Sequence, residues 1–287
     1  MKDTYTLITD RIIAELESGT IPWHKPWTCS QPAISHTTGK AYSLLNQLLL
    51  GGRSGEYLTF QQAQKEGGRV KKGEKASMVV FWKWLTIEDE DTGEEKDIPF
   101  LKYYNVFHIN QCEGIVPHYP DNEPVVMTPA LAHDLADAKI HRYITANDVT
   151  LICRESCEAF YRPSTDTVVL PLRTQFGDTA EYYSTAFHEL THSTGHPKRL
   201  NRITETARFG SASYSREELC AELGASFLLN HLGLETPSSF KNNAAYINHW
   251  LGVLKDDKRL LVTAAGQADK AVRLILGEEA DNDVLEG

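Results

Sequence analysis

The apolar residues of the first half of the chain predict three helices and a β-hairpin. The helices are expected over residues 4–18, 43–50 and 58–66. The first helix is amphipathic and meets a stop signal at Gly19. Two runs rich in β-branched and aromatic residues, 76–87 and 98–108, flank an acidic segment and therefore predict the strands of a hairpin.

The second half combines short strands with longer helices. Strands are predicted over residues 149–153 and 167–172, and helices over residues 129–144, 179–194, 216–232, 243–255 and 265–276. A segment with four prolines, Val116 to Pro129, indicates an extended linker between the halves. We predict an α+β protein with two domains, residues 1–115 and 129–287, joined by a linker over residues 116–128.

The composition is that of a soluble globular protein, with 41% hydrophobic and 24% charged residues. No run approaches the roughly 18 apolar residues of a membrane span, and the amino terminus lacks the apolar core of a signal peptide. The five cysteines are odd in number and form no CxxC pair, which argues against a disulfide scaffold and a structural zinc finger. We expect a cytoplasmic protein that does not bind membranes.

Residues 188–192, His-Glu-Leu-Thr-His, carry the strongest chemical signal in the chain. Histidines four residues apart share one face of a helix, so His188 and His192 can hold one metal ion. Glu189 is then placed to act as the general base for the water that attacks a peptide carbonyl. The motif therefore predicts a zinc metallopeptidase-type site in which Glu189 is the catalytic residue.

The surroundings of this motif favour a peptidase over a chance match. Asp178 as N-cap and Gly195 as stop signal delimit the helix that the motif requires. Upstream, residues 167–172 fit the edge strand with which zinc peptidases pair an extended substrate.

A catalytic zinc site needs a third protein ligand, and the sequence offers three candidates. Glu222 is favoured, because a carboxylate in the middle of an apolar helix is costly unless it is paired or bound to metal. Glu218 lies one turn earlier, but it forms a potential capping box with Ser215 and so has a local role. His196 follows His192 at a shorter spacing than the three-histidine motif requires. Zinc (Zn²⁺) fits the two-histidine, one-glutamate set best, and manganese (Mn²⁺) or another divalent ion is the alternative.

The first domain combines aromatic with basic residues, although the net charge of the chain is −10. Residues 61–84 hold six basic residues against two acids, whereas residues 88–97 hold seven acids. Aromatic rings stack on unpaired bases and basic side chains follow phosphates, so the pattern favours single-stranded nucleic acid. An ordinary core is the alternative, because Trp82 and Trp84 share one face of a strand. The candidate DNA-binding residues are Trp23, Trp27, Arg69, Lys71, Lys72, Lys75, Trp82 and Lys83.

The chain resembles the ArdC antirestriction proteins of conjugative plasmids and, in its first domain, the TraC-type plasmid primases. The matching segments are residues 8–27, 67–84, 103–111, 187–202, 214–228 and 246–271. The resemblance implies an amino-terminal domain that binds single-stranded DNA (ssDNA). It also implies a carboxy-terminal zincin domain similar to the SprT-like proteases that act on DNA-bound proteins. Carried onto this sequence, it implies His188, His192 and Glu222 as metal ligands and Glu189 as base.

Three functions are consistent with these features. The first is an ssDNA-binding antirestriction protein that protects incoming plasmid DNA during conjugation and cleaves a DNA-associated protein, with a host restriction enzyme as candidate target. The second is a protein that coats ssDNA without proteolysis and uses its metal site structurally. The third is a stress-response metalloprotease that cleaves a repressor, which ranks last because the sequence shows no helix-turn-helix motif.

Overall fold

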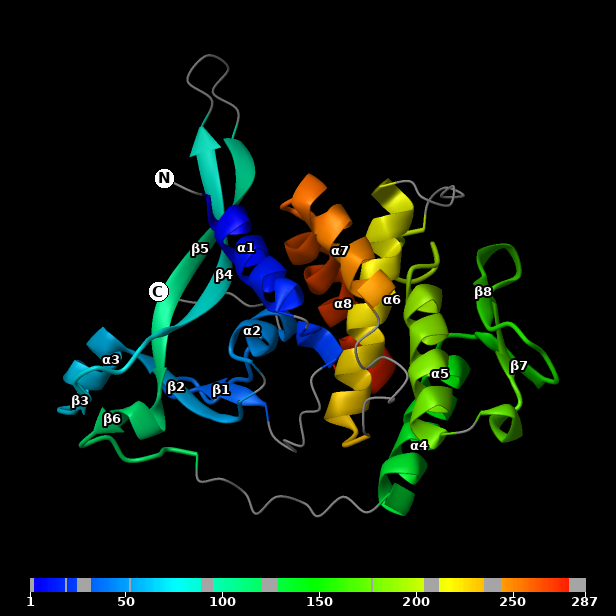
Figure 1. Cartoon of the computed structure of the whole chain (residues 1–287), viewed down its shortest axis with the longest axis horizontal. Helices are drawn as coiled ribbons and strands as arrows, with labels where there is room; N and C mark the ends of the chain where they lie inside the picture. The colour runs from blue at the N-terminus through cyan, green and yellow to red at the C-terminus, as the bar shows by residue number, and fades with distance from the viewer. Residues whose placement is uncertain are drawn as a thin grey trace. The chain divides into compact units, whose positions relative to one another are not determined.

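The computed structural model describes most of the chain (Figure 1). The described residues are 3–18, 20–24, 32–51, 53–88, 95–119, 129–176, 178–203, 212–234 and 244–278. The chain forms two compact units, one from residues 1–11 and 31–124 and the other from residues 12–30 and 125–287. The carboxy-terminal unit therefore includes residues 12–30, which differs from the contiguous first domain expected from the sequence. Helix α1, Thr4–Glu17, is confirmed and spans this boundary.

The amino-terminal unit contains a four-stranded sheet in the order β1-β2-β5-β4. Its strands are β1 (Ala33–Ser35), β2 (Gly55–Thr59), β4 (Ser77–Glu88) and β5 (Glu95–His108). β1 and β2 are parallel, and the other neighbouring strands are antiparallel. The predicted hairpin is confirmed, because β4 pairs with β5 along its whole length. The two short strands β1 and β2 were not predicted.

The described residues of this unit also form two α-helices and a small second sheet. The helices α2 (Leu44–Leu49) and α3 (Phe60–Lys65) confirm the predicted ones, and β3 (Arg69–Val70) pairs with β6 (Cys112–Glu113). The side chain of Asn46 fixes α2 on β4, since its amide bonds both the N–H and the carbonyl of Val80 at 2.7 Å. A neighbouring β-strand would make the same two hydrogen bonds to Val80. Asn46 therefore takes the place of a strand at this point of the edge of β4.

Beyond residues 12–30, the described part of the carboxy-terminal unit forms five α-helices and a three-stranded sheet. The helices are α4 (Pro129–Ala146), α5 (Thr179–Thr194), α6 (Ala212–His231), α7 (Ala244–Asp256) and α8 (Leu260–Leu276), as predicted within a few residues. The strands are β7 (Thr150–Arg154), β8 (Phe160–Arg162) and β9 (Thr167–Pro171). α6 packs against both α5 and α8 (Figure 1). Fully buried alanines on α8, Ala264, Ala265, Ala268 and Ala271, allow this close approach.

The sheet order corrects one prediction. β9 lies between β7 and β8, parallel to the first and antiparallel to the second. Thr167, Val168 and Val169 are therefore paired on both sides and do not form an edge. β7 pairs with β9 as far as Pro171 whereas β8 pairs only as far as Val169, so the predicted edge is confined to the carboxyl end of β9. The sequence did not reveal β8 because it is three residues long.

Trp23 is a core residue of the carboxy-terminal unit, which corrects its assignment to DNA binding. Its side chain is 1% exposed and packs edge-on against Trp250 of α7, with ring centroids 6.3 Å apart. The hydroxyl of Ser226 in α6 donates a hydrogen bond to the carbonyl oxygen of Trp23. The indole ring is thus unavailable for stacking on a base. Trp27 lies outside the described residues.

Cys112, Cys153, Cys157 and Cys220 are all free thiols. Among the described residues, no helix combines the length and the apolar character that crossing a bilayer requires.

Candidate metal centre

The HELTH motif lies on α5, as predicted, and the helix has the predicted ends. The Asp178 carboxylate accepts a hydrogen bond from the N–H of Ala180 at 2.9 Å, and Gly195 is the C-cap. Phe187 and Leu190 are fully buried, which fixes one face of α5 in the core. The opposite face carries the two histidines of the motif, whose side chains are 23% and 13% exposed.

His188 and His192 converge with Glu218 of α6 on one point. The two Nε2 atoms are 3.1 Å apart. The carboxylate oxygens of Glu218 lie 3.7 Å from Nε2 of His188 and 3.6 Å from Nε2 of His192. Two ligands that each lie about 2.1 Å from a tetrahedral ion are about 3.4 Å apart. The donor set of two imidazoles and one carboxylate therefore fits a divalent ion in both chemistry and spacing.

The third side chain of the group is Glu218, whereas the sequence favoured Glu222 as the third ligand. Helix α6 begins at Ala212, so Ser215 lies inside the helix and does not cap it. Glu218 is thereby released from the capping box and faces both imidazoles. Glu222 does not join the converging group and acts on His188 through its negative charge. His196 turns elsewhere, with Nδ1 at 3.8 Å from the Asp166 carboxylate.

The electrostatics of this centre favour a cation. Burial lowers the pKa of His188, but the nearby carboxylate of Glu218 and the negative charges of Glu222 and Glu189 outweigh it and raise the pKa to about 9. Glu189 itself is 8% exposed. Positive charge is thus stabilised at the point where the imidazoles and Glu218 meet.

A second carboxylate, which was not predicted from the sequence, lies behind His192 and orients its ring. Glu217 lies 3.2 Å from Nδ1 of His192 and receives hydrogen bonds from Arg202 at 2.9 and 3.1 Å. Burial raises the pKa of Glu217, but His192 and Arg202 outweigh it and hold the pKa below its usual value. A carboxylate on Nδ1 keeps the proton there and leaves the Nε2 lone pair for a metal. The Glu217-Glu218 pair was visible in the sequence, but the helix register was needed to separate the two roles.

Solved structures share this architecture over the whole chain. The metal-free crystal structure of the antirestriction ArdC protein from the R388 plasmid is 39% identical, with a TM-score of 0.73 over 96% of this chain and 97% of that one. Its Mn(II)-bound structure is 38% identical, with a TM-score of 0.74 over 98% of this chain and 100% of that one. The chain belongs to the ArdC antirestriction protein family.

Matches of this chain to family models and to individual related proteins agree with this membership. Residues 2–107 match the N-terminal domain of anti-restriction factor ArdC, and residues 138–267 match a zincin-like metallopeptidase family. The DNA primase TraC of Escherichia coli is 32% identical over 97% of this chain, which spans 27% of that primase. An uncharacterized protein of Sinorhizobium fredii, y4eC, is 31% identical over 97% of this chain and 93% of its own length. The chain therefore spans about a quarter of the TraC primase and nearly all of y4eC.

Close packing between α5 and α6 positions Glu218 in this ArdC-family centre, and Gly224 permits it. A Cβ at Gly224 would lie 2.7 Å from the side chain of Thr191, which is fully buried. We expect Gly224→Ala to lower the free energy of unfolding by about 1–3 kcal/mol through overpacking. The control is Gly252→Ala on α7, where a Cβ meets nothing within 4 Å and the helix should gain up to about 1 kcal/mol. Chemical denaturation measures both variants, and equal stability changes would contradict this role of Gly224.

The predicted basic residues of the amino-terminal unit lie on its surface around β3. Arg69, Lys71, Lys72 and Lys75 are all exposed. Arg69 forms an ion pair with Glu113 at 2.7 Å, and the Lys71 ammonium donates to the carbonyl of Asn110 at 2.8 Å. Trp82 and Lys83 lie in β4, as predicted for the strand, but their side chains are outside the described part of the chain.

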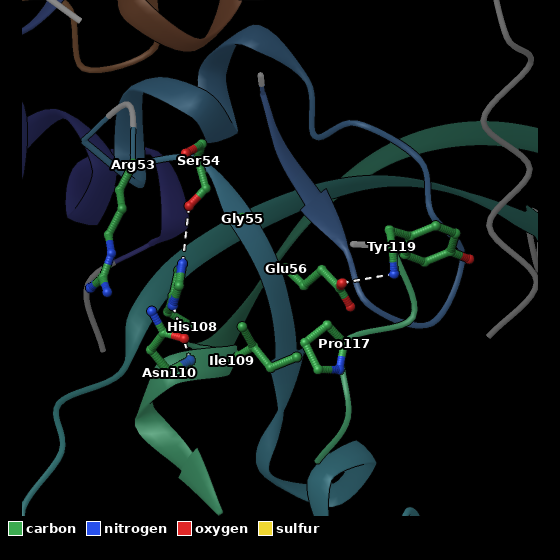
Figure 2. A pocket seen from close by; sticks show the side chains of 9 residues that line it. All are labelled: Arg53, Ser54, Gly55, Glu56, His108, Ile109, Asn110, Pro117 and Tyr119. Carbon is green, nitrogen blue, oxygen red and sulfur yellow. Dashed lines mark hydrogen bonds between the residues drawn. The ribbon is translucent and has the colours of Figure 1, made fainter. Parts of the chain in front are cut away.

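A pocket of about 630 Å³ adjoins this basic surface (Figure 2). It is lined by Arg53, Ser54, Gly55, Glu56, His108, Ile109, Asn110, Pro117 and Tyr119. Gly55 has φ +112°, and a Cβ there would lie 2.5 Å from Nε2 of His108, so only glycine fits beside this ring. Asn110 connects the pocket to Lys71. The volume falls within the range of about 300–1,000 Å³ of ligand sites.

Proposed function

We propose that this protein binds ssDNA through its amino-terminal unit and protects incoming plasmid DNA from restriction during conjugation in the cytoplasm. We further propose that its carboxy-terminal unit hydrolyses peptide bonds in a DNA-associated protein, with a host restriction enzyme as the candidate target. The observation that carries the proposal is the convergence of His188, His192 and Glu218 beside Glu189.

In this proposal, His188, His192 and Glu218 hold a divalent ion, and Glu217 orients His192. Zinc suits two imidazoles and a carboxylate, and manganese is the alternative because the R388 ArdC protein has a Mn(II)-bound structure. When bound, such an ion supplies Lewis-acid activation of water and of the scissile carbonyl. Glu189 accepts the proton from the attacking water and passes it to the leaving amine.

The DNA-binding part of the proposal rests on the exposed basic surface and the adjoining pocket. Arg69, Lys71, Lys72 and Lys75 would contact phosphates, and the pocket has room for a nucleotide. Tyr119 is one of the lining residues and is 39% exposed, so its ring could stack on a base. The second candidate function, ssDNA coating without proteolysis, draws on the same residues and differs only in leaving Glu189 without a role.

The salt dependence of ssDNA binding tests these phosphate contacts. Each phosphate contact on a single strand contributes about 0.7 to the slope of log K against log salt. We expect the double variant Lys72→Gln, Lys75→Gln to lower the slope by about 1.4 and to weaken binding at low salt. The matched control is Lys198→Gln, Lys270→Gln, which removes two exposed lysines from the carboxy-terminal unit. An unchanged slope in the first variant, measured by fluorescence anisotropy, would exclude this surface as the DNA site.

A further inference from the structure

A second group of metal-binding side chains lies in the amino-terminal unit. His36 follows β1 and is fully buried, with Nε2 at 2.8 Å from Glu66 at the end of α3. Nε2 of His118 lies 3.8 Å from the same oxygen of Glu66. The two imidazole rings stack, with centroids 4.1 Å apart and planes 21° apart. One nitrogen from each ring and one carboxylate oxygen lie within 4.8 Å of one another.

A further carboxylate orients this group. Glu56 of β2 is 3% exposed and contacts Nδ1 of His36. Its oxygens also accept the N–H groups of His118 at 3.2 Å and Tyr119 at 2.9 Å, the latter shown in Figure 2. The contact with Glu56 favours a proton on Nδ1, which leaves the Nε2 lone pair of His36 facing the oxygen of Glu66. A proton on Nε2 satisfies this pair at 2.8 Å, and a metal ion that binds both atoms would replace that proton.

The arrangement repeats the design of the carboxy-terminal centre. There, two imidazoles and Glu218 converge while Glu217 holds Nδ1 of His192. Here, two imidazoles and Glu66 converge while Glu56 holds Nδ1 of His36. Carboxylates placed behind ligating histidines are a regular feature of metal sites. A divalent ion would also balance the two negative charges of Glu56 and Glu66, one of which is buried.

We propose that His36, Glu66 and His118 form a second divalent-metal site, with Glu56 as the residue that orients His36. The ligands favour a zinc-type ion, because imidazole and carboxylate donors in a group of three suit it. The His118 side chain is 50% exposed, so the site opens to solvent and an ion can enter and leave. Its three ligands come from separate chain segments, so the ion would fasten residue 118 beside the pocket to the segment after β1 and to the end of α3.

Metal stoichiometry of the full chain tests this site. The protein is freed of metal with a chelator and titrated with Zn²⁺, and in parallel with Co²⁺ read by visible absorption. We expect two ions per chain in the wild type, one in His118→Ala, one in His192→Ala and none in the double variant. Glu66→Gln, which preserves the size of the side chain, should also bind one ion. The control is His141→Ala, an exposed histidine of α4, which should keep both ions.

The outcomes separate this site from the peptidase-type centre. An ion that remains in His192→Ala and disappears when His118→Ala is added can come only from the amino-terminal site. Wild-type protein that binds a single ion, lost in His192→Ala and retained in His118→Ala, would overturn the proposal and leave a proton between His36 and Glu66. Two ions in His118→Ala would overturn it as well. Circular dichroism verifies that each variant is folded.

Discussion

Glu218→Gln is expected to weaken metal binding at the carboxy-terminal centre by at least about 100-fold, because changes outside the first ligand shell alone cost 10–100-fold. The carboxamide keeps the size of the side chain but loses the anionic oxygen that faces both imidazoles. The same loss also removes the largest contribution that raises the pKa of His188.

Glu222→Gln is the matched control for this prediction, since it makes the same change one helical turn later. Glu222 acts on His188 through charge and does not join the converging group, so we expect less than about a 10-fold loss of affinity. The titration is made in the His118→Ala background, so that only the carboxy-terminal centre is measured. The reverse order of the two effects would make Glu222 the third ligand, as the sequence favoured.

Glu189→Gln is expected to lower peptide hydrolysis by about 10²–10⁴-fold while the metal content stays unchanged. Glu189 lies beside His188 on α5, is 8% exposed, and is near enough for its negative charge to raise the pKa of His188. Glutamine fills the same space but cannot accept the proton of the attacking water. Cleavage of an unfolded protein substrate, followed by gel electrophoresis and mass spectrometry, measures the loss.

Glu181→Gln serves as control, because it makes the same substitution in the first turn of the same helix. This variant should cleave at the wild-type rate. Equal rates for Glu189→Gln and the wild type, with metal bound in both, would show that another group accepts the proton.

The long periodic elements were predictable from the sequence, and so was the pair of ligands within one helix. Helices α4 to α8 and the β4–β5 hairpin follow from local apolar patterns. His188 and His192 meet because they are one turn apart on α5, which needs no tertiary information. The two α+β units follow from the order of these elements, with residues 12–30 as the exception.

The remaining site residues depend on packing between distant segments. Glu218 and Glu222 lie one turn apart on α6, and the packing of α6 against α5 brings Glu218 together with the two histidines. Trp23 is as suitable for stacking on a base as on Trp250, and its sequence neighbourhood does not distinguish the two. His36, Glu66 and His118 are too far apart along the chain for any local pattern to connect them.

Plasmid transfer into a restricting host tests the central claim most directly. Wild type and Glu189→Gln are compared, after both have been shown to bind metal and ssDNA equally well. We expect the wild type to protect the incoming plasmid and Glu189→Gln to fail, because in our proposal protection requires hydrolysis at the centre of His188, His192 and Glu218. Full protection by Glu189→Gln would contradict this proposal and assign antirestriction to DNA binding alone.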